Sequence, residues 1–160
     1  MQPIEELRYL ILAAQREGSR LFAEALRPLS LTPSQAEVLR VLQDHEPLSL
    51  IALGDLLVCE TGSPSRLVQG LVEDGLVERL PSATDKRMVT LTLTDRGREM
   101  AAKVGELESQ FYAANAGLVN DAPLPEILAF LRRFVDGKPA GMALARRTGR
   151  EPASETRAPG

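Results

Sequence analysis

A mainly α-helical fold with one small β-hairpin is predicted by three observations. Along most of the chain, apolar residues recur at steps of three and four, the period of amphipathic helices. Capping residues mark where these segments start, and glycine or proline marks where they end. Only residues 88–93 alternate cleanly between apolar and polar, as a half-buried strand does.

The composition limits the class of protein. The chain has 160 residues, enough for one compact domain or two small interdependent ones. Aromatic residues make up 4% and there is no Trp, so Leu, Val, Ile and Ala must form the core, which favours helix-on-helix packing. One cysteine, Cys59, excludes an internal disulfide and favours a cytoplasmic protein. No segment resembles a signal peptide or a membrane span, so we expect no membrane partner.

The first helix is expected from about Ile4 to Leu26, and Pro28 ends it. Its spacing predicts an amphipathic helix. The residues of the apolar stripe are Ile4, Leu7, Ile11, Ala14, Leu21, Phe22 and Ala25. Gly18 continues this stripe and would let a partner helix approach closely.

The second helix has the strongest start signal in the chain. Thr32 is the expected N-cap, Pro33 fits the first helical position, and Gln35 completes a capping box. The helix should end between Asp44 and Pro47. Its inward-facing residues are Ala36, Leu39 and Leu42.

Two short capped helices follow. Ser49 caps a third helix that is expected to run through Leu57, and residues 59–62 form a polar turn. Ser63 caps a fourth helix, which ends at Gly75. Its first residue is Pro64, and its apolar stripe consists of Leu67, Val68, Leu71 and Val72. Two short helices joined by a glycine-containing turn predict a helix-turn-helix.

A β-hairpin is predicted directly after this helix pair. Residues 76–80 are expected to form a short strand, residues 81–87 a turn-rich loop, and residues 88–93 the second strand. Val89, Leu91 and Leu93 share one face, while Thr90 and Thr92 share the other. A hairpin in this position is a wing, so the predicted fold is a winged helix-turn-helix.

Two helices are expected after the wing. Thr94 caps the first, whose apolar residues form a two-heptad seam suited to a partner helix. The seam consists of Met100, Val104, Leu107, Phe111, Ala114 and Leu118. The last helix should end near Gly137. Its apolar residues are Ile127, Phe130, Leu131 and Phe134.

We therefore predict three regions. Residues 32–97 form the winged helix-turn-helix, residues 1–31 and 98–136 a helical dimerisation region, and residues 137–160 a flexible basic tail. From residue 138 the tail has five basic and two acidic residues, 5 − 2 = +3. Since the net charge is −3, the rest of the chain carries −3 − 3 = −6.

Three stretches in the winged segment are more specific than the caps. They are Gly62-Ser63-Pro64-Ser65-Arg66-Leu67-Val68, Gly75-Leu76-Val77-Glu78-Arg79, and Asp85-x-Arg87 followed by Leu91-x-Leu93-Thr94-x-x-Gly97. With them, residues 31–100 resemble the multiple antibiotic resistance regulator (MarR) family of bacterial transcription factors. The flanking helices lie where that family keeps its dimerisation region, so the resemblance extends from about Ile4 to Phe134.

The resemblance implies a two-fold homodimer that binds a pseudo-palindromic operator in double-stranded DNA, usually as a repressor. It also implies that a small aromatic or amphipathic ligand often weakens DNA binding from a site between the dimerisation helices and the winged domain. One departure is that Gln69 and Gly70 stand where the family commonly has an acidic residue followed by Arg. A possible phosphate contact is thereby lost, and a mid-helix Gly costs roughly 1 kcal/mol relative to Ala.

The predicted DNA-binding residues lie on the fourth helix and at the wing tip. They are Ser63, Ser65, Arg66, Gln69, Lys86 and Arg87. Ser65 and Gln69 can hydrogen-bond base edges in the major groove, and Arg66 suits guanine or phosphate. The helix N-terminus at Ser63 attracts phosphate, and Arg87 suits a narrow minor groove.

Each assignment has a structural alternative. Arg66 could instead pair with Asp85 and brace the wing. Gln69 could be an ordinary solvated helix residue, Arg87 a plain surface charge, and Gly70 an accommodation to close packing. From residue 59 to 99 the basic and acidic residues sum to 6 − 7 = −1, so we expect weak non-specific affinity and salt-dependent specific binding.

Other functions have less support. Tyr9, Phe22, Phe111 and Tyr112 are candidates for an effector pocket, or else for the core or the dimer interface. Cys59 could sense oxidation or be a small buried apolar residue. With a single His, His45, and no phosphate loop or catalytic triad, we predict no metal, no cofactor and no enzyme. The runner-up function is a winged-helix protein-interaction module, which the acidic body and the glycine in the recognition helix would suit.

Overall fold

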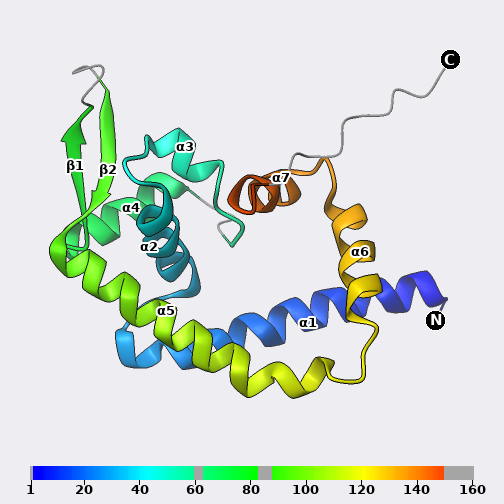
Figure 1. Ribbon diagram of the computed structural model, residues 1–160. Helices are drawn as coiled ribbons and strands as arrows, with labels where there is room; N and C mark the ends of the chain where they lie inside the picture. Colours follow the sequence, from blue (N-terminus) through cyan, green and yellow to red (C-terminus); the bar gives the residue numbers. More distant parts are fainter. Residues whose placement is uncertain (1, 60–62, 83–87, 150–160) are drawn as a thin grey trace, which may run out of the picture.

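Figure 1 shows a computed structural model that describes residues 2–59, 63–82 and 88–149. The fold is mainly helical with a two-stranded wing, as predicted. The elements are α1 (Pro3–Leu26), a 3-10 turn (Arg27–Leu29), α2 (Pro33–His45), α3 (Leu50–Gly54), α4 (Pro64–Glu73), β1 (Val77–Pro81), β2 (Val89–Leu93), α5 (Asp95–Asn115), a second 3-10 turn (Ala116–Val119), α6 (Leu124–Val135) and α7 (Pro139–Arg147). None of the helices in the described ranges is long and apolar enough to cross a membrane.

Helix α2 lies at the centre of the core. The predicted capping box is confirmed: the Gln35 N–H donates to Thr32 Oγ1 at 3.2 Å, and the Thr32 N–H donates to the Gln35 side chain at 2.9 Å. The helix is buried on more than the predicted face. Its buried residues are Ala36, Glu37, Val38, Leu39, Val41 and Leu42. Because α1, α4, α5 and β2 all pack against it, α2 has little solvent face left.

The wing follows the predicted alternation. Strands β1 and β2 pair antiparallel from Val77 opposite Leu93 to Pro81 opposite Val89, so that β1 starts and ends one residue later than expected. Leu91 and Leu93 are buried, whereas Val89, farther along the hairpin, is 53% exposed. The wing loop, residues 83–87, lies outside the described residues.

A short third segment fixes the wing to the body. Leu48, just before α3, bridges to Leu91 of β2, and the Leu91 N–H donates to the Leu48 carbonyl at 2.7 Å. This bridge was not predicted, because an isolated pair of residues has no apolar period of its own.

Helix α5 begins as predicted, since the Gly97 N–H donates to Thr94 Oγ1 at 3.0 Å. The first half of its predicted seam is buried within the chain and is not available to a partner helix of a second chain. Val104 is fully buried within the same chain, and Met100 and Leu107 pack against the same core. The first half of the seam thus packs on α1 and α2, whereas Leu118 lies beyond the helix and is 80% exposed. Heptad spacing identifies an apolar helix face that packs against another helix, but it does not show whether that helix belongs to the same chain or to a second one.

The C-terminal region differs from the prediction. Helix α6 ends before Gly137, whose φ is +66°, as expected. The following residues were predicted as a flexible tail, yet residues 139–147 form α7, in which Ala143 is only 3% exposed. A nine-residue helix has little stability alone, so α7 depends on tertiary contacts. These contacts produce no apolar period in the sequence, which is why the helix was not predicted. Residues 150–160 lie outside the described part.

Candidate nucleic-acid interface

The helix-turn-helix is built by α3 and α4 against α2. The predicted cap of α3 is confirmed, because the Ala52 N–H donates to Ser49 Oγ at 3.1 Å. The helix is shorter than expected and ends at Gly54, although Leu57 is still buried. Ending the helix early lets Leu57 reach the core while the chain turns toward α4. Residues 60–62 of this turn lie outside the described residues.

Helix α4 presents its predicted apolar face to the core. Val68 and Leu71 are fully buried, and Leu67 and Val72 pack partly against them. Ser63 is the N-cap residue and Pro64 occupies the first turn, but the Ser63 side chain makes no capping hydrogen bond.

The backbone explains why Ser63 differs from the other caps. Its ψ is 109°, whereas ψ is 159° at Thr32, 161° at Ser49 and 170° at Thr94, where the hydroxyl does accept a hydrogen bond from the helix. The prediction that Ser63 caps α4 through its side chain is therefore wrong. Its hydroxyl is not used by the helix.

The opposite face of α4 is polar and exposed. Ser65, Arg66 and Gln69 lie there together with Glu73. The Gln69 side-chain amide donates to Glu73 Oε1 at 2.8 Å, which orients the amide and leaves its carbonyl oxygen available. The structure thus places three of the six predicted DNA-binding residues on one face of α4 and a fourth, Ser63, at the N-terminus of the helix. The other two, Lys86 and Arg87, lie outside the described residues, as does Asp85, the alternative partner of Arg66.

The end of α4 is tied to the start of α5. The Arg96 guanidinium donates to the Asp74 carbonyl at 3.0 Å, and the Thr94 hydroxyl donates to the Gly75 carbonyl at 2.8 Å. Both bonds satisfy carbonyl groups at the C-terminus of the recognition helix. Sequence reasoning missed them, because a side chain that bonds a distant backbone carbonyl leaves no local pattern.

Two acidic side chains connect α2 to the wing and to α5. Glu46 pairs with Arg98 and accepts a hydrogen bond from the Leu93 N–H at 2.6 Å. Farther along the same interface, Arg40 Nε donates to Glu108 at 3.1 Å in a partly buried pair. Two ion pairs, Glu46–Arg98 and Arg40–Glu108, therefore hold α2 of the winged segment against α5.

Gly70 is not required by close packing. A Cβ atom at Gly70 would meet nothing within 4 Å, which contradicts the packing alternative. Gly97 is the opposite case, because a Cβ atom there would overlap the carbonyl oxygen of Leu76.

Cys59 is exposed, so the interpretation as a buried apolar residue is wrong. The pKa of its thiol is raised to about 11, first by desolvation from the surrounding protein and then by the charge and hydrogen bonding of Glu37. A thiol with this pKa is protonated at neutral pH, which disfavours thiolate-dependent oxidation.

The four predicted pocket aromatics do not meet in one place. Phe22 and Phe111 contact edge to face at 5.4 Å between ring centroids, and Tyr112 lies 6.0 Å from Phe111. The pKa of Tyr112 is raised, mainly by desolvation. Tyr9 lies 22 − 9 = 13 residues before Phe22 on the same helix, or about 20 Å away. It contacts Arg8, whose guanidinium lies 4.1 Å from the centroid of the Tyr9 ring.

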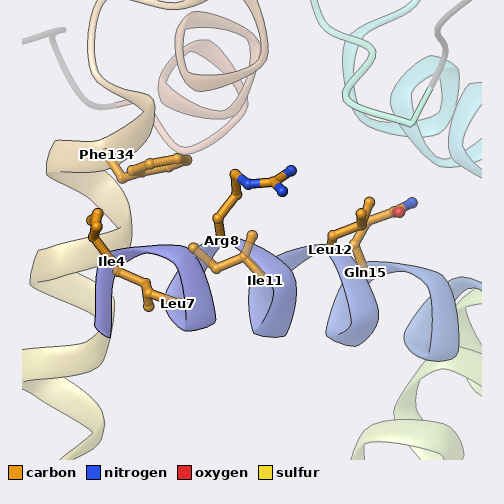
Figure 2. A pocket seen from close by; sticks show the side chains of 7 residues that line it. All are labelled: Ile4, Leu7, Arg8, Ile11, Leu12, Gln15 and Phe134. Carbon is orange, nitrogen blue, oxygen red and sulfur yellow. The ribbon is translucent and has the colours of Figure 1, made fainter. Parts of the chain in front are cut away.

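A cavity lies elsewhere, between the first half of α1 and the end of α6 (Figure 2). Its volume is about 520 Å³. The residues that line it are Ile4, Leu7, Arg8, Ile11, Leu12, Gln15 and Phe134. None of the four predicted pocket aromatics is among them. Its wall is mostly apolar, with one guanidinium and one amide.

A pair of short helices packed on α2, a recognition helix with an exposed polar face and an attached wing define the winged helix-turn-helix class of DNA-binding proteins. Residues 31–97 match the family model of a winged helix DNA-binding domain. The multiple antibiotic resistance protein MarR of Escherichia coli is 33% identical over 101 residues, which cover 63% of this chain and 70% of that protein. The chain therefore belongs to the MarR family of transcription regulators.

Solved structures and a further relative agree with this assignment. A mutant MarR from Escherichia coli complexed with operator DNA superposes with a TM-score of 0.70 at 30% identity, covering 82% of this chain and 94% of that one. BpsR of Bordetella bronchiseptica, whose DNA binding is regulated by 6-hydroxynicotinic acid, shares the fold with a TM-score of 0.74 at 22% identity, covering 86% and 99%. The organic hydroperoxide resistance transcriptional regulator of Bacillus subtilis is 28% identical over 102 residues, covering 64% and 69%.

Proposed function

We propose that this protein is a repressor that binds a pseudo-palindromic operator as a homodimer and is released by a small ligand. The observation that carries the proposal is the polar face of α4. Ser65, Arg66 and Gln69 are exposed directly opposite the buried Val68 and Leu71. A repressor of this kind works on double-stranded DNA in the cytoplasm.

In this proposal α4 enters the major groove. Ser65 and the free carbonyl oxygen of Gln69 contact base edges, and Arg66 binds guanine or phosphate. The Ser63 hydroxyl, which does not cap its own helix, binds a phosphate at the helix N-terminus. Lys86 and Arg87 of the wing add phosphate or minor-groove contacts.

A second copy of the chain covers the apolar surface of α1 and α6. Helix α6 has no buried residue, although it is strongly amphipathic, and Phe134 is 52% exposed beside the cavity. On α1, Ile4 is 70% and Leu10 60% exposed. An apolar surface of this extent marks an interface. Residues 1–31 and 98–136 form the dimerisation region, so that two recognition helices lie about 34–36 Å apart.

Ligand release would act through α5. The Arg40–Glu108 and Glu46–Arg98 pairs and the bonds at the end of α4 couple any shift of α5 to the recognition helix. Support for a ligand comes from the likeness in fold to BpsR. The site we propose lies at Phe22, Phe111 and Tyr112, between the dimerisation helices and the winged segment.

The test is fluorescence-anisotropy titration of duplex DNA from upstream of the gene, at two salt concentrations, with a scrambled duplex. We expect specific binding that weakens steeply with salt. Arg87→Ala should weaken it and lower the salt slope by about 1.8, because the homodimer loses one phosphate contact from each subunit at about 0.9 per contact. Lys138→Ala is the control, because Lys138 is exposed and lies outside the recognition helix, the wing and the proposed dimerisation region. If no duplex from a random library binds, the regulator function is excluded and the protein-interaction module takes its place.

A further inference from the structure

Glu37 of α2 is the one buried polar or charged residue within the described ranges, at 7% exposure. Both of its carboxylate oxygens accept backbone hydrogen bonds. The Val58 N–H donates to Oε1 at 2.9 Å, and the Cys59 N–H donates to Oε2 at 2.8 Å. Val58 and Cys59 lie where the chain leaves α3 and turns toward α4. Glu37 therefore fixes the backbone of Val58 and Cys59 on the α3 side of the connection to α4.

The counter-ion of Glu37 comes from the far end of the sequence. Arg147, the last residue of α7, donates from Nη1 to Glu37 Oε1 at 2.6 Å, and the two side chains are 30% and 6% exposed. Figure 1 shows α7 beside the end of α3, where Arg146 contacts Asp55. A buried carboxylate is very unfavourable unless it is paired, and Arg147 supplies the counter-charge that the burial of Glu37 requires.

Helix α7 is held at this place mainly by its arginines. Ala143 is its only buried residue, and Leu144 is 44% exposed. Arg146 donates to the Asp55 carbonyl at 3.1 Å, but both of these side chains are about half exposed. The apolar contribution to docking is small. Of the two ion pairs between α7 and the described part of the helix-turn-helix, Glu37–Arg147 is the one with a buried member.

We propose that Glu37 and Arg147 are positioning residues for operator binding. Docked α7 supplies the counter-ion of Glu37, Glu37 accepts hydrogen bonds from the N–H groups of Val58 and Cys59, and these two residues direct the chain toward α4. Without Arg147 the buried carboxylate loses its counter-ion and moves toward water, which weakens its hydrogen bonds to Val58 and Cys59. The part of this inference that concerns DNA rests on the proposed function.

The experiment compares Arg147→Ala with Arg146→Ala, an identical change at the neighbouring residue, which removes a solvent-exposed hydrogen bond and ion pair to Asp55. In the full-length protein, we expect Arg147→Ala to speed amide hydrogen exchange at Val58 and Cys59 about tenfold and to weaken operator binding by about the same factor. Arg146→Ala should change both by less than about twofold. Arg147→Lys retains the charge and should recover most of both effects.

A double-mutant comparison isolates the pair. In a Glu37→Gln background the buried charge is absent, so Arg147→Ala should have little further effect on exchange or affinity. Equal exchange and equal affinity in the Arg147→Ala and Arg146→Ala proteins would overturn the proposal while leaving operator binding intact. If the wild-type protein binds no operator, the proposed function fails, and the exchange rates at Val58 and Cys59 still decide whether Arg147 holds the turn.

Discussion

Gly70 and Gly97 differ in what an added methyl group would meet. Open space surrounds Gly70 in the middle of α4, whereas the carbonyl of Leu76 lies against Gly97 at the start of α5. The sequence places both glycines in helices. It does not reveal that another segment of the chain, at Leu76, packs against Gly97 and that no described segment packs against Gly70. Tertiary packing therefore decides which glycine can be replaced.

We predict that Gly70→Ala raises the free energy of unfolding by about 0.5–1 kcal/mol, because alanine loses less backbone entropy in a helix. Urea unfolding at constant slope measures the change. Gly97→Ala, the matched substitution, should lower stability by more than about 1 kcal/mol, because the carbonyl of Leu76 or α5 itself must shift. A loss of stability in Gly70→Ala would show that α4 needs glycine for a reason beyond packing.

Cys59 gives a prediction for the pH dependence of stability. Its pKa rises from 9.0 to about 11 in the folded protein, so the unfolded chain releases the proton first as the pH increases. The contribution of the protonated thiol is complete below about pH 9 and is lost between about pH 9 and pH 11. Unfolding free energies across this range should fall more steeply for the wild type than for Cys59→Ser. Parallel curves would contradict the raised pKa.

At the scale of elements, helix starts were predicted well because capping depends on local sequence. Thr32, Ser49 and Thr94 all accept the hydrogen bonds expected of them. Ser63 occupies an equivalent position without making that bond, because its backbone ψ differs. The residue type identifies where a helix begins, and the backbone path into the helix decides whether the side chain caps it.

This contrast predicts different effects for two matched substitutions. Thr94→Ala should lower the free energy of unfolding by about 1–2 kcal/mol, because it removes the cap of α5 and the bond to the Gly75 carbonyl. Ser63→Ala should change stability by only a few tenths of a kcal/mol while weakening operator binding. Denaturant unfolding together with anisotropy titration separates the two effects. A large stability loss in Ser63→Ala would mean that its hydroxyl supports the fold.

Helix ends and short helices were predicted less well. Helix α3 ends at Gly54 although leucines continue at the helical period to Leu57, and α7 forms where composition indicated a flexible tail. In both cases long-range contacts decide the outcome: Leu57 packs into the core, and Arg147 reaches Glu37. Local periodicity contains no information about such contacts.

For the whole molecule, the apolar surface of α1 and α6 predicts dimerisation. Phe134→Glu places a charge beside the cavity and should convert the protein to a monomer at micromolar concentration, as measured by light scattering. Ile51→Glu is the control, because Ile51 is 80% exposed on α3, away from this surface. Dimers in both variants would place the interface elsewhere, and a monomeric wild type would exclude the dimer.

The sequence alone determined the winged helix-turn-helix, the order of its elements, the apolar faces of α2 and α4, and the polar face that contains Arg66 and Gln69. These features follow from capping chemistry and from apolar periods of two and three to four residues, which are local properties. Only the tertiary structure decided that half of the α5 seam packs within the chain, that Tyr9 lies apart from Phe111, and that Arg147 pairs with Glu37. Such contacts join segments that are far apart in the sequence. Their free energy depends on how the whole chain packs, so it cannot be derived from any single segment.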